Sequence, residues 1–122
     1  MKNLATVNQE VIWAMITIAF IMLCISIFYW KNPPIKINKL YGYRTRHSMK
    51  NQEIWTAANK HSSIMFINHA LILFVITVVL SFLKTPYSLL IFLIVLLGGI
   101  LFGALRTSQF LKNNFDQEGN KK

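Results

Sequence analysis

Acidic side chains are scarce in this chain of 122 residues, which has four of them against thirteen lysines and arginines. None of the four lies inside a long apolar stretch, so the sequence offers no carboxylate pair for general acid–base chemistry. It also lacks a Gly-x-Ser-x-Gly turn, a His-Glu-x-x-His pair and a glycine-rich phosphate loop. These absences argue against the common hydrolase, metalloprotease and nucleotide-binding classes. We expect a protein that is not an enzyme.

Cysteine is rarer still, with Cys24 as the single example. One thiol excludes a disulfide within the chain and a zinc site built from several cysteines. The three histidines, His47, His61 and His69, lack the spacing and the carboxylate neighbours of a metal site. We therefore expect neither a metal nor a cofactor.

Three long apolar runs dominate what is present. Residues 11–30 and 88–105 carry no charge, and residues 64–83 have only four polar interruptions. A helix rises about 1.5 Å per residue, so each run can cross the roughly 30 Å hydrocarbon core of a bilayer. Backbone groups in lipid must be bonded within their own segment, which requires helices. The sequence predicts an all-α integral membrane protein with three transmembrane helices in a single membrane domain, residues 1–122.

Positive charge is distributed unevenly between the two sides of this predicted arrangement. The connector, residues 31–63, and the polar tail, residues 106–122, would share one side and together hold 11 lysines and arginines. Lys2 and Lys84 are the two on the other side. The positive-inside rule then places the connector and the C-terminus in the cytoplasm and the N-terminus outside. Topology and attraction to anionic lipid headgroups account for the net charge of +9, so we expect no nucleic-acid partner.

The connector changes character along its length. Pro33-Pro34 ends the first span behind the interfacial anchor Tyr29, and residues 35–47 are predicted to be extended or turned. Ser48 is the predicted N-cap of a helix that starts at the next residue and continues unbroken into the second span. Residues at alternating steps of four and three form one face of that helix: Asn51, Trp55, Ala58, Ser62, Met65, His69, Ile72 and Ile76.

Polar and small residues inside the spans predict helix contacts. His69, beside Asn68, lies about one and a half turns into the second span, and we favour an interhelical hydrogen bond over a functional role inside the bilayer. Gly99 and Gly103 form a small-xxx-small pair that permits close approach of another helix. That helix belongs either to this chain, through a tight hairpin of the second and third spans, or to a second copy in a homo-oligomer. The tail from Lys112 is predicted to be frayed.

The most unusual stretch is Tyr41-Gly42-Tyr43-Arg44-Thr45. The glycine between two tyrosines indicates a backbone position that a side chain would hinder. One interpretation is an interfacial belt, with tyrosines at headgroup depth and Arg44 and Arg46 on lipid phosphates. Alternatively, Arg44 acts as a rigid fork of donors that locks the connector into a compact cap. Such a cap would bind a ligand or brace the helices, and we favour bracing because tight turns and bidentate arginines are commonly structural.

At these residues the sequence resembles the SdpI/YfhL family of bacterial membrane proteins, in its short, three-span form. The namesake of that family is an immunity protein that protects a producing cell from its own toxic sporulation-delay peptide. It also takes part in signalling by holding a transcriptional repressor at the membrane when toxin is present. The resemblance rests on residues spread through the connector: Pro33-Pro34, Asn38, Tyr41-Gly42-Tyr43-Arg44-Thr45, Ser48, Asn51, Trp55 and Ala58-Asn59.

The resemblance implies a multi-pass protein of the bacterial cell membrane that confers resistance to a membrane-active peptide toxin by binding it. A signalling adaptor that recruits a cytoplasmic regulator through the basic connector and tail is one alternative. A second alternative is an enzyme or transporter that acts on lipid or an envelope precursor and binds phosphate through Arg44 and Arg46. The resemblance also implies a set of binding or signature positions: Asn38, Tyr41, Gly42, Tyr43, Arg44, Thr45, Ser48, Asn51, Trp55 and Asn59.

Overall fold

Three α-helices make up most of the computed structural model, which describes residues 7–122. Helix α1 spans Gln9–Lys31, α2 spans Gln52–Leu83 and α3 spans Ser88–Asn114. All three are long and apolar enough to cross a membrane, which confirms the predicted all-α integral membrane fold. Lys2, which enters the charge count above, lies outside the described residues.

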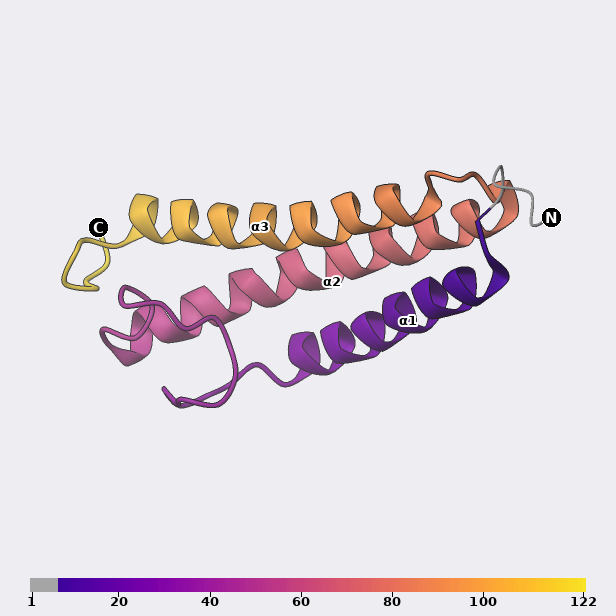
Figure 1. Cartoon of the computed structure of the whole chain (residues 1–122). Helices are drawn as coiled ribbons and strands as arrows, with labels where there is room; N and C mark the ends of the chain where they lie inside the picture. Colours follow the sequence, from indigo (N-terminus) through magenta and orange to yellow (C-terminus); the bar gives the residue numbers. More distant parts are fainter. Residues whose placement is uncertain (1–6) are drawn as a thin grey trace.

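Helix α2 is the central element, with α1 and α3 on either side of it (Figure 1). The two outer helices barely touch each other. The connector and the C-terminal tail lie at one end of the molecule, and the start of α1 lies near the α2–α3 turn at the other (Figure 1). There the backbone N–H of Val7 donates to the carbonyl of Lys84 at 3.4 Å. This is the up–down–up arrangement that the three predicted spans require.

The start of α2 corrects one prediction. The sequence predicted Ser48 as the N-cap, but the helix begins three residues later than expected, and its cap is Asn51. The Oδ1 atom of Asn51 accepts a hydrogen bond from the backbone N–H of Ile54 at 3.1 Å. The Ser48 hydroxyl is already engaged in a turn, where it accepts from the N–H of Thr45 at 2.8 Å. Serine and asparagine are equally good caps, so the sequence pattern alone did not distinguish the two positions.

The burial of α2 follows the predicted stripe in its first half and departs from it later. Trp55, Ala58 and His69 are buried as the stripe predicts, whereas Ile72 on the same stripe is 55% exposed. Because α2 packs against a helix on each side, its buried band is wider than one stripe and passes through Leu73 instead. The helix is continuous from the connector into the second span, as expected.

Two apolar clusters hold the helices together. In the membrane-spanning part, lipid is as apolar as the side chains, so the first cluster stabilises the fold through close packing. The second cluster lies at the connector end, where removal of apolar surface from water adds its own contribution. The first comprises Met15, Ala19, Leu73, Leu80 and Phe92, and the second Ile54, Ala58, Leu111 and Phe115.

The C-terminal tail is folded, which differs from the frayed end that the sequence predicted. Helix α3 continues nine residues beyond the predicted span, to Asn114, and the chain then turns back so that Phe115 is buried. The side-chain amide of Asn51 donates to the carbonyl of Gly119 at 2.8 Å, and the carbonyl of Asp116 lies 2.7 Å from Nε2 of His47. Backbone carbonyls of the tail are therefore joined to side chains of the connector.

Candidate functional site

Asn59 is the centre of the connector's packing. Its side chain is buried, and its Oδ1 atom accepts hydrogen bonds from the Tyr29 hydroxyl at 2.8 Å and from the backbone N–H of Tyr43 at 2.7 Å. Its Nδ2 atom donates to the carbonyl of Trp55 at 3.0 Å. One amide thus joins α1, the connector and α2. Both lone pairs of its oxygen are used, so this oxygen is not free to bind a ligand.

Gly42 has two separate reasons to be glycine. Its φ angle of +114° lies in the region that residues with a side chain rarely adopt. A Cβ atom added there would also press against Oδ1 of Asn59 and the ring of Pro34. The expected backbone position that a side chain would hinder is therefore present, and the obstacle is the Asn59 amide.

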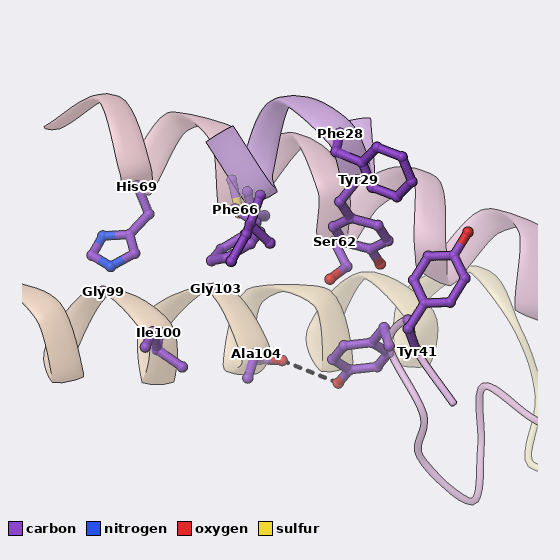
Figure 2. A pocket seen from close by; sticks show the side chains of 14 residues that line it. Phe28, Tyr29, Tyr41, Ser62, Phe66, His69, Gly99, Ile100, Gly103 and Ala104 are labelled. Atoms are coloured by element: carbon purple, nitrogen blue, oxygen red, sulfur yellow. Dashed lines mark hydrogen bonds between the residues drawn. The ribbon is translucent and has the colours of Figure 1, made fainter. Parts of the chain in front are cut away.

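The two tyrosines that flank Gly42 point to different helices. Tyr41 donates from its hydroxyl to the carbonyl of Asn32 at 3.0 Å, and its ring meets that of Tyr29 edge to face at 6.4 Å. Tyr43 donates to the carbonyl of Ala104 in α3 at 3.2 Å, the dashed line in Figure 2. Burial raises the pKa of the Tyr43 phenol above its usual value, which favours the neutral hydroxyl that donates this bond.

Two further residues of the predicted set, Trp55 and Asn38, form hydrogen bonds that fix the first half of the connector. Trp55 is fully buried, and its Nε1–H donates to the carbonyl of Pro34 at 2.9 Å. The Oδ1 atom of Asn38 accepts from the backbone N–H groups of Leu40 and Tyr41 at 2.9 and 3.0 Å. This is an asparagine-stabilised turn, and it ends at the first of the two tyrosines.

The side chains of Arg44, Thr45 and Ser48 form hydrogen bonds with other residues of the connector. Arg44 is exposed, and its Nη1 atom donates to the carbonyl of Lys39. Thr45 and Ser48 bond reciprocally, each backbone N–H donating to the other's hydroxyl, at 2.8 and 3.0 Å. The Arg44 hydrogen bond joins two parts of the connector, and the predicted role of Arg44 as a fork that locks a compact cap stays a prediction.

Tyr29 and His61 are contact residues that the sequence analysis did not assign to the site. Tyr29 was interpreted as an interfacial anchor, and nothing in its neighbourhood predicted a hydrogen bond to Asn59, thirty residues away. His61 places Nδ1 3.0 Å from the Thr107 hydroxyl and stacks on Phe110 at 4.4 Å. It lies off the predicted stripe of α2, so periodicity gave no signal for it.

A pocket of about 380 Å³, which we call the lateral groove, lies between the two outer helices and is lined by α2 as well. The connector closes one end of it with residues 41–43, and most of its lining is apolar. Figure 2 shows its residues converging from all three helices. Its floor on α2 consists of Ser62, Met65, Phe66 and His69. Its wall on α1 consists of Ile25, Phe28 and Tyr29, and its wall on α3 consists of Gly99, Ile100, Gly103 and Ala104.

His69 lies between α2 and α3 at the far end of the lateral groove. Its imidazole packs on Gly99, where an added Cβ atom would overlap the ring (Figure 2). The side chain is 8% exposed, yet Nε2 has no hydrogen-bond partner among residues 7–122. The backbone of Leu96 in α3 lies within hydrogen-bonding reach of the imidazole, so the interhelical contact predicted for His69 is present although Nε2 has no part in it. Gly103 faces Met65, so the glycine pair meets α2 of the same chain, whereas Asn68 is exposed.

Basic side chains gather where the connector meets the tail. Arg46, Lys50, Lys112 and Lys122 line a second pocket, of about 640 Å³, together with Phe115 and a single carboxylate, that of Asp116. In the part of the chain that the structure describes, no three His, Cys, Asp or Glu side chains are grouped closely enough to hold a metal ion. The chemistry of this end is therefore the attraction of cationic side chains for anionic groups.

Comparison with known proteins places these residues in a family. The sequence profile of the SdpI/YfhL protein family matches residues 34–105, which is more than half of the chain. YfhL of Bacillus subtilis (strain 168) is 46% identical over 41 residues, an alignment that covers 34% of this chain and 37% of that protein. No solved structure matches significantly. The profile covers all but the first three residues of the connector, all of α2 and much of α3, and the chain belongs to the SdpI/YfhL protein family.

Proposed function

We propose that this chain protects its cell from a membrane-active peptide toxin by binding the peptide, without catalysis. The observation that carries the proposal is the family match over residues 34–105, which includes Asn59 and its partners Tyr43 and Trp55. The resemblance described above connects that family with immunity to a toxic peptide. A binding mechanism needs a stable arrangement of helices in the bilayer, and the connector provides one.

The chemistry of the connector supports binding over catalysis. A nucleophile or general base must have a free, activated polar atom within reach of its substrate. The Oδ1 atom of Asn59 and the polar atoms of Trp55 and Tyr43 are instead bonded to one another or to backbone groups. These bonds hold the ends of the helices in register.

The proposed orientation places the connector and the tail in the cytoplasm. Both regions lie at the same end of the structure, and together they carry 11 of the chain's thirteen lysines and arginines. The positive-inside rule favours that end for the cytoplasmic side. A peptide that inserts into the bilayer from outside would then meet the lipid-facing surfaces of the three helices.

A survival assay tests the proposal. Bacteria that lack their own immunity genes would express the wild-type chain, the Arg44→Ala variant or an empty vector, and then be challenged with a sporulation-delay-type peptide. We expect the wild type to restore growth. We expect Arg44→Ala to protect as well, because its contact lies within an exposed loop. Equal killing of wild-type and empty-vector cells, with the protein confirmed in the membrane, would contradict the proposal.

A signalling adaptor is the second candidate, and one observation favours it. Arg46, Lys50, Lys112 and Lys122 surround a single pocket at the proposed cytoplasmic end. Lys112 lies seven residues beyond the predicted end of the third span, about 10 Å along the helix, so the cluster can reach past the headgroups. An acidic regulator would complement this charge. Recovery of such a protein with the chain from toxin-treated cells would support this function.

A further inference from the structure

Another pocket, of about 420 Å³, lies where the end of α1 meets α2, at the connector end of the molecule (Figure 1). We call it the junction pocket. Helix α1 contributes Trp30 and Lys31, the connector contributes residues 33–35, and α2 contributes Lys60 and Ile64. The pocket therefore combines two cationic side chains with an apolar part, and neither the connector's hydrogen bonds nor the lateral groove uses those two lysines.

The connector wall of the junction pocket is fixed by two side chains of α2. The Nε1–H of Trp55 donates to the carbonyl of Pro34 at 2.9 Å, and the side-chain amide of Gln52 donates to the carbonyl of Ile35. These bonds also engage two carbonyl oxygens, whose partial negative charge opposes an anion. A wall that is already in place lowers the entropic cost of binding a ligand.

The charge that lines the junction pocket is positive only. Lys31 and Lys60 come from two different helices, both side chains are exposed, and within residues 7–122 no carboxylate lines the pocket. Glu53, the acidic residue of α2, lies about two turns before Lys60 and lines a different pocket. Two cations around one pocket without an opposite charge favour an anionic ligand.

The depth of the junction pocket in the membrane indicates which anion it fits. Trp30 is the last residue of the first predicted span and Ile64 is the first residue of the second, so both lie at the edge of the hydrocarbon core. Lys31 follows at once, and Lys60 lies four residues, about 6 Å, outside that edge. The headgroup layer of each leaflet is roughly 5–8 Å thick, so both lysines lie at the depth of lipid phosphates. A pocket that is apolar toward the core and cationic toward water matches a phospholipid.

We infer that the junction pocket binds an anionic phospholipid, with the lipid phosphate between Lys31 and Lys60 and the start of the acyl chains against Trp30 and Ile64. The inference goes beyond the proposed function and does not depend on it. A zwitterionic lipid fits less well, because the cation of a choline headgroup would lie near two ammonium groups. A free phosphate ion offers the same charge but nothing to cover the apolar part.

Native mass spectrometry of the full chain in mild detergent, with ligand added in steps, tests this inference. The probes are phosphatidylglycerol, phosphatidylcholine and inorganic phosphate. We expect phosphatidylglycerol to bind at least about fivefold more tightly than phosphatidylcholine. Lys31→Gln and Lys60→Gln should each weaken phosphatidylglycerol binding about fivefold, the contribution of one lysine near an anionic lipid surface, and Lys60→Arg should keep it. Lys36→Gln is the matched control, because it removes one charge from an exposed connector lysine outside the pocket, and it should bind as the wild type does.

Three results would overturn the inference. Equal affinity for the two lipids would show that net negative charge is not recognised. Equal weakening by Lys36→Gln and by the two pocket variants would assign the effect to overall charge. Displacement of phosphatidylglycerol by inorganic phosphate, beyond the effect of chloride at the same ionic strength, would identify a site for free phosphate instead of lipid. None of these measurements involves a toxic peptide, so their failure would leave the proposed function standing.

Discussion

At the scale of single residues, the connector depends on side chains that each serve several partners. The amide of Asn59 joins Tyr29, Tyr43 and Trp55, and the absence of a side chain at Gly42 leaves room for it. A hydrogen bond contributes only about 1 kcal/mol net, but a buried donor left without its acceptor costs more. Replacement of the central residue is therefore more damaging than loss of any one bond.

The matched pair Gly42→Ala and Gly98→Ala tests this account of the connector. An alanine at position 42 would have to adopt a φ of +114° beside Oδ1 of Asn59, a conformation that costs about 1–3 kcal/mol before any steric overlap. At Gly98 an added Cβ meets nothing within 4 Å, and alanine favours the helix by about 1 kcal/mol. Thermal unfolding in mild detergent should show a lower midpoint for Gly42→Ala and an equal or higher one for Gly98→Ala. Equal midpoints for Gly42→Ala and the wild type would refute the account.

The residue scale is also where sequence analysis was least complete. The need for glycine at position 42 was predicted from the two tyrosines beside it, but the cause of that need, Asn59, is seventeen residues away in the chain. Tyr29 was interpreted as an interfacial anchor for the same reason: its hydrogen bond depends on how α1 and α2 meet. Such contacts have no local pattern, so a single sequence does not reveal them.

At the scale of elements, hydropathy predicted the three spans because a bilayer imposes a minimum length of apolar helix. The ends of the helices were harder. Ser48 and Asn51 are both good caps, and only the reciprocal turn of Ser48 with Thr45 decides between them. The tail was predicted to be frayed because it is polar, yet its backbone carbonyls bond to the connector and its Asp116 carboxylate accepts from backbone N–H groups of the tail. Polarity alone does not distinguish a folded surface segment from a disordered one.

The fold of the tail has a predictable response to pH. Backbone N–H groups, above all that of Asn120, hold the pKa of the Asp116 carboxyl below its usual value of 3.8. A carboxyl whose pKa is lower in the folded state stabilises the fold above its unfolded pKa, and this contribution disappears as the pH falls through the folded pKa. The tail should therefore keep its fold at neutral pH and lose the support of this carboxylate only in acid.

Nuclear magnetic resonance in detergent micelles can follow this titration through the amide proton of Asn120. We expect a midpoint below 3.8, because the Asn120 amide is a donor to the carboxylate. The Asp116→Asn variant is the control, since it keeps an oxygen acceptor but has no proton to bind. Its Asn120 amide should lack that step. A wild-type midpoint at or above 3.8 would show that the N–H donors do not stabilise the carboxylate.

At the scale of the whole molecule, the important feature is a three-helix arrangement whose outer helices diverge. The sequence predicted three spans, a hairpin of the second and third spans, and the location of the connector and the tail on the same side of the membrane. It did not predict the lateral groove, which exists only because α1 and α3 both pack on α2 without closing on each other. The sequence singled out His69 because it lies inside the second span, but its place at the end of the groove follows from the packing of α2 and α3.

For the whole molecule, the central claim is that the chain protects the cell by binding the peptide without altering it chemically. The most direct measurement is affinity purification of the chain from peptide-challenged, surviving cells, followed by mass spectrometry of the peptide that accompanies it. We predict recovery of the peptide with the wild-type chain at its unmodified mass. Survival with no peptide retained by the chain, or with a cleaved or chemically modified peptide, would contradict a mechanism of protection by binding.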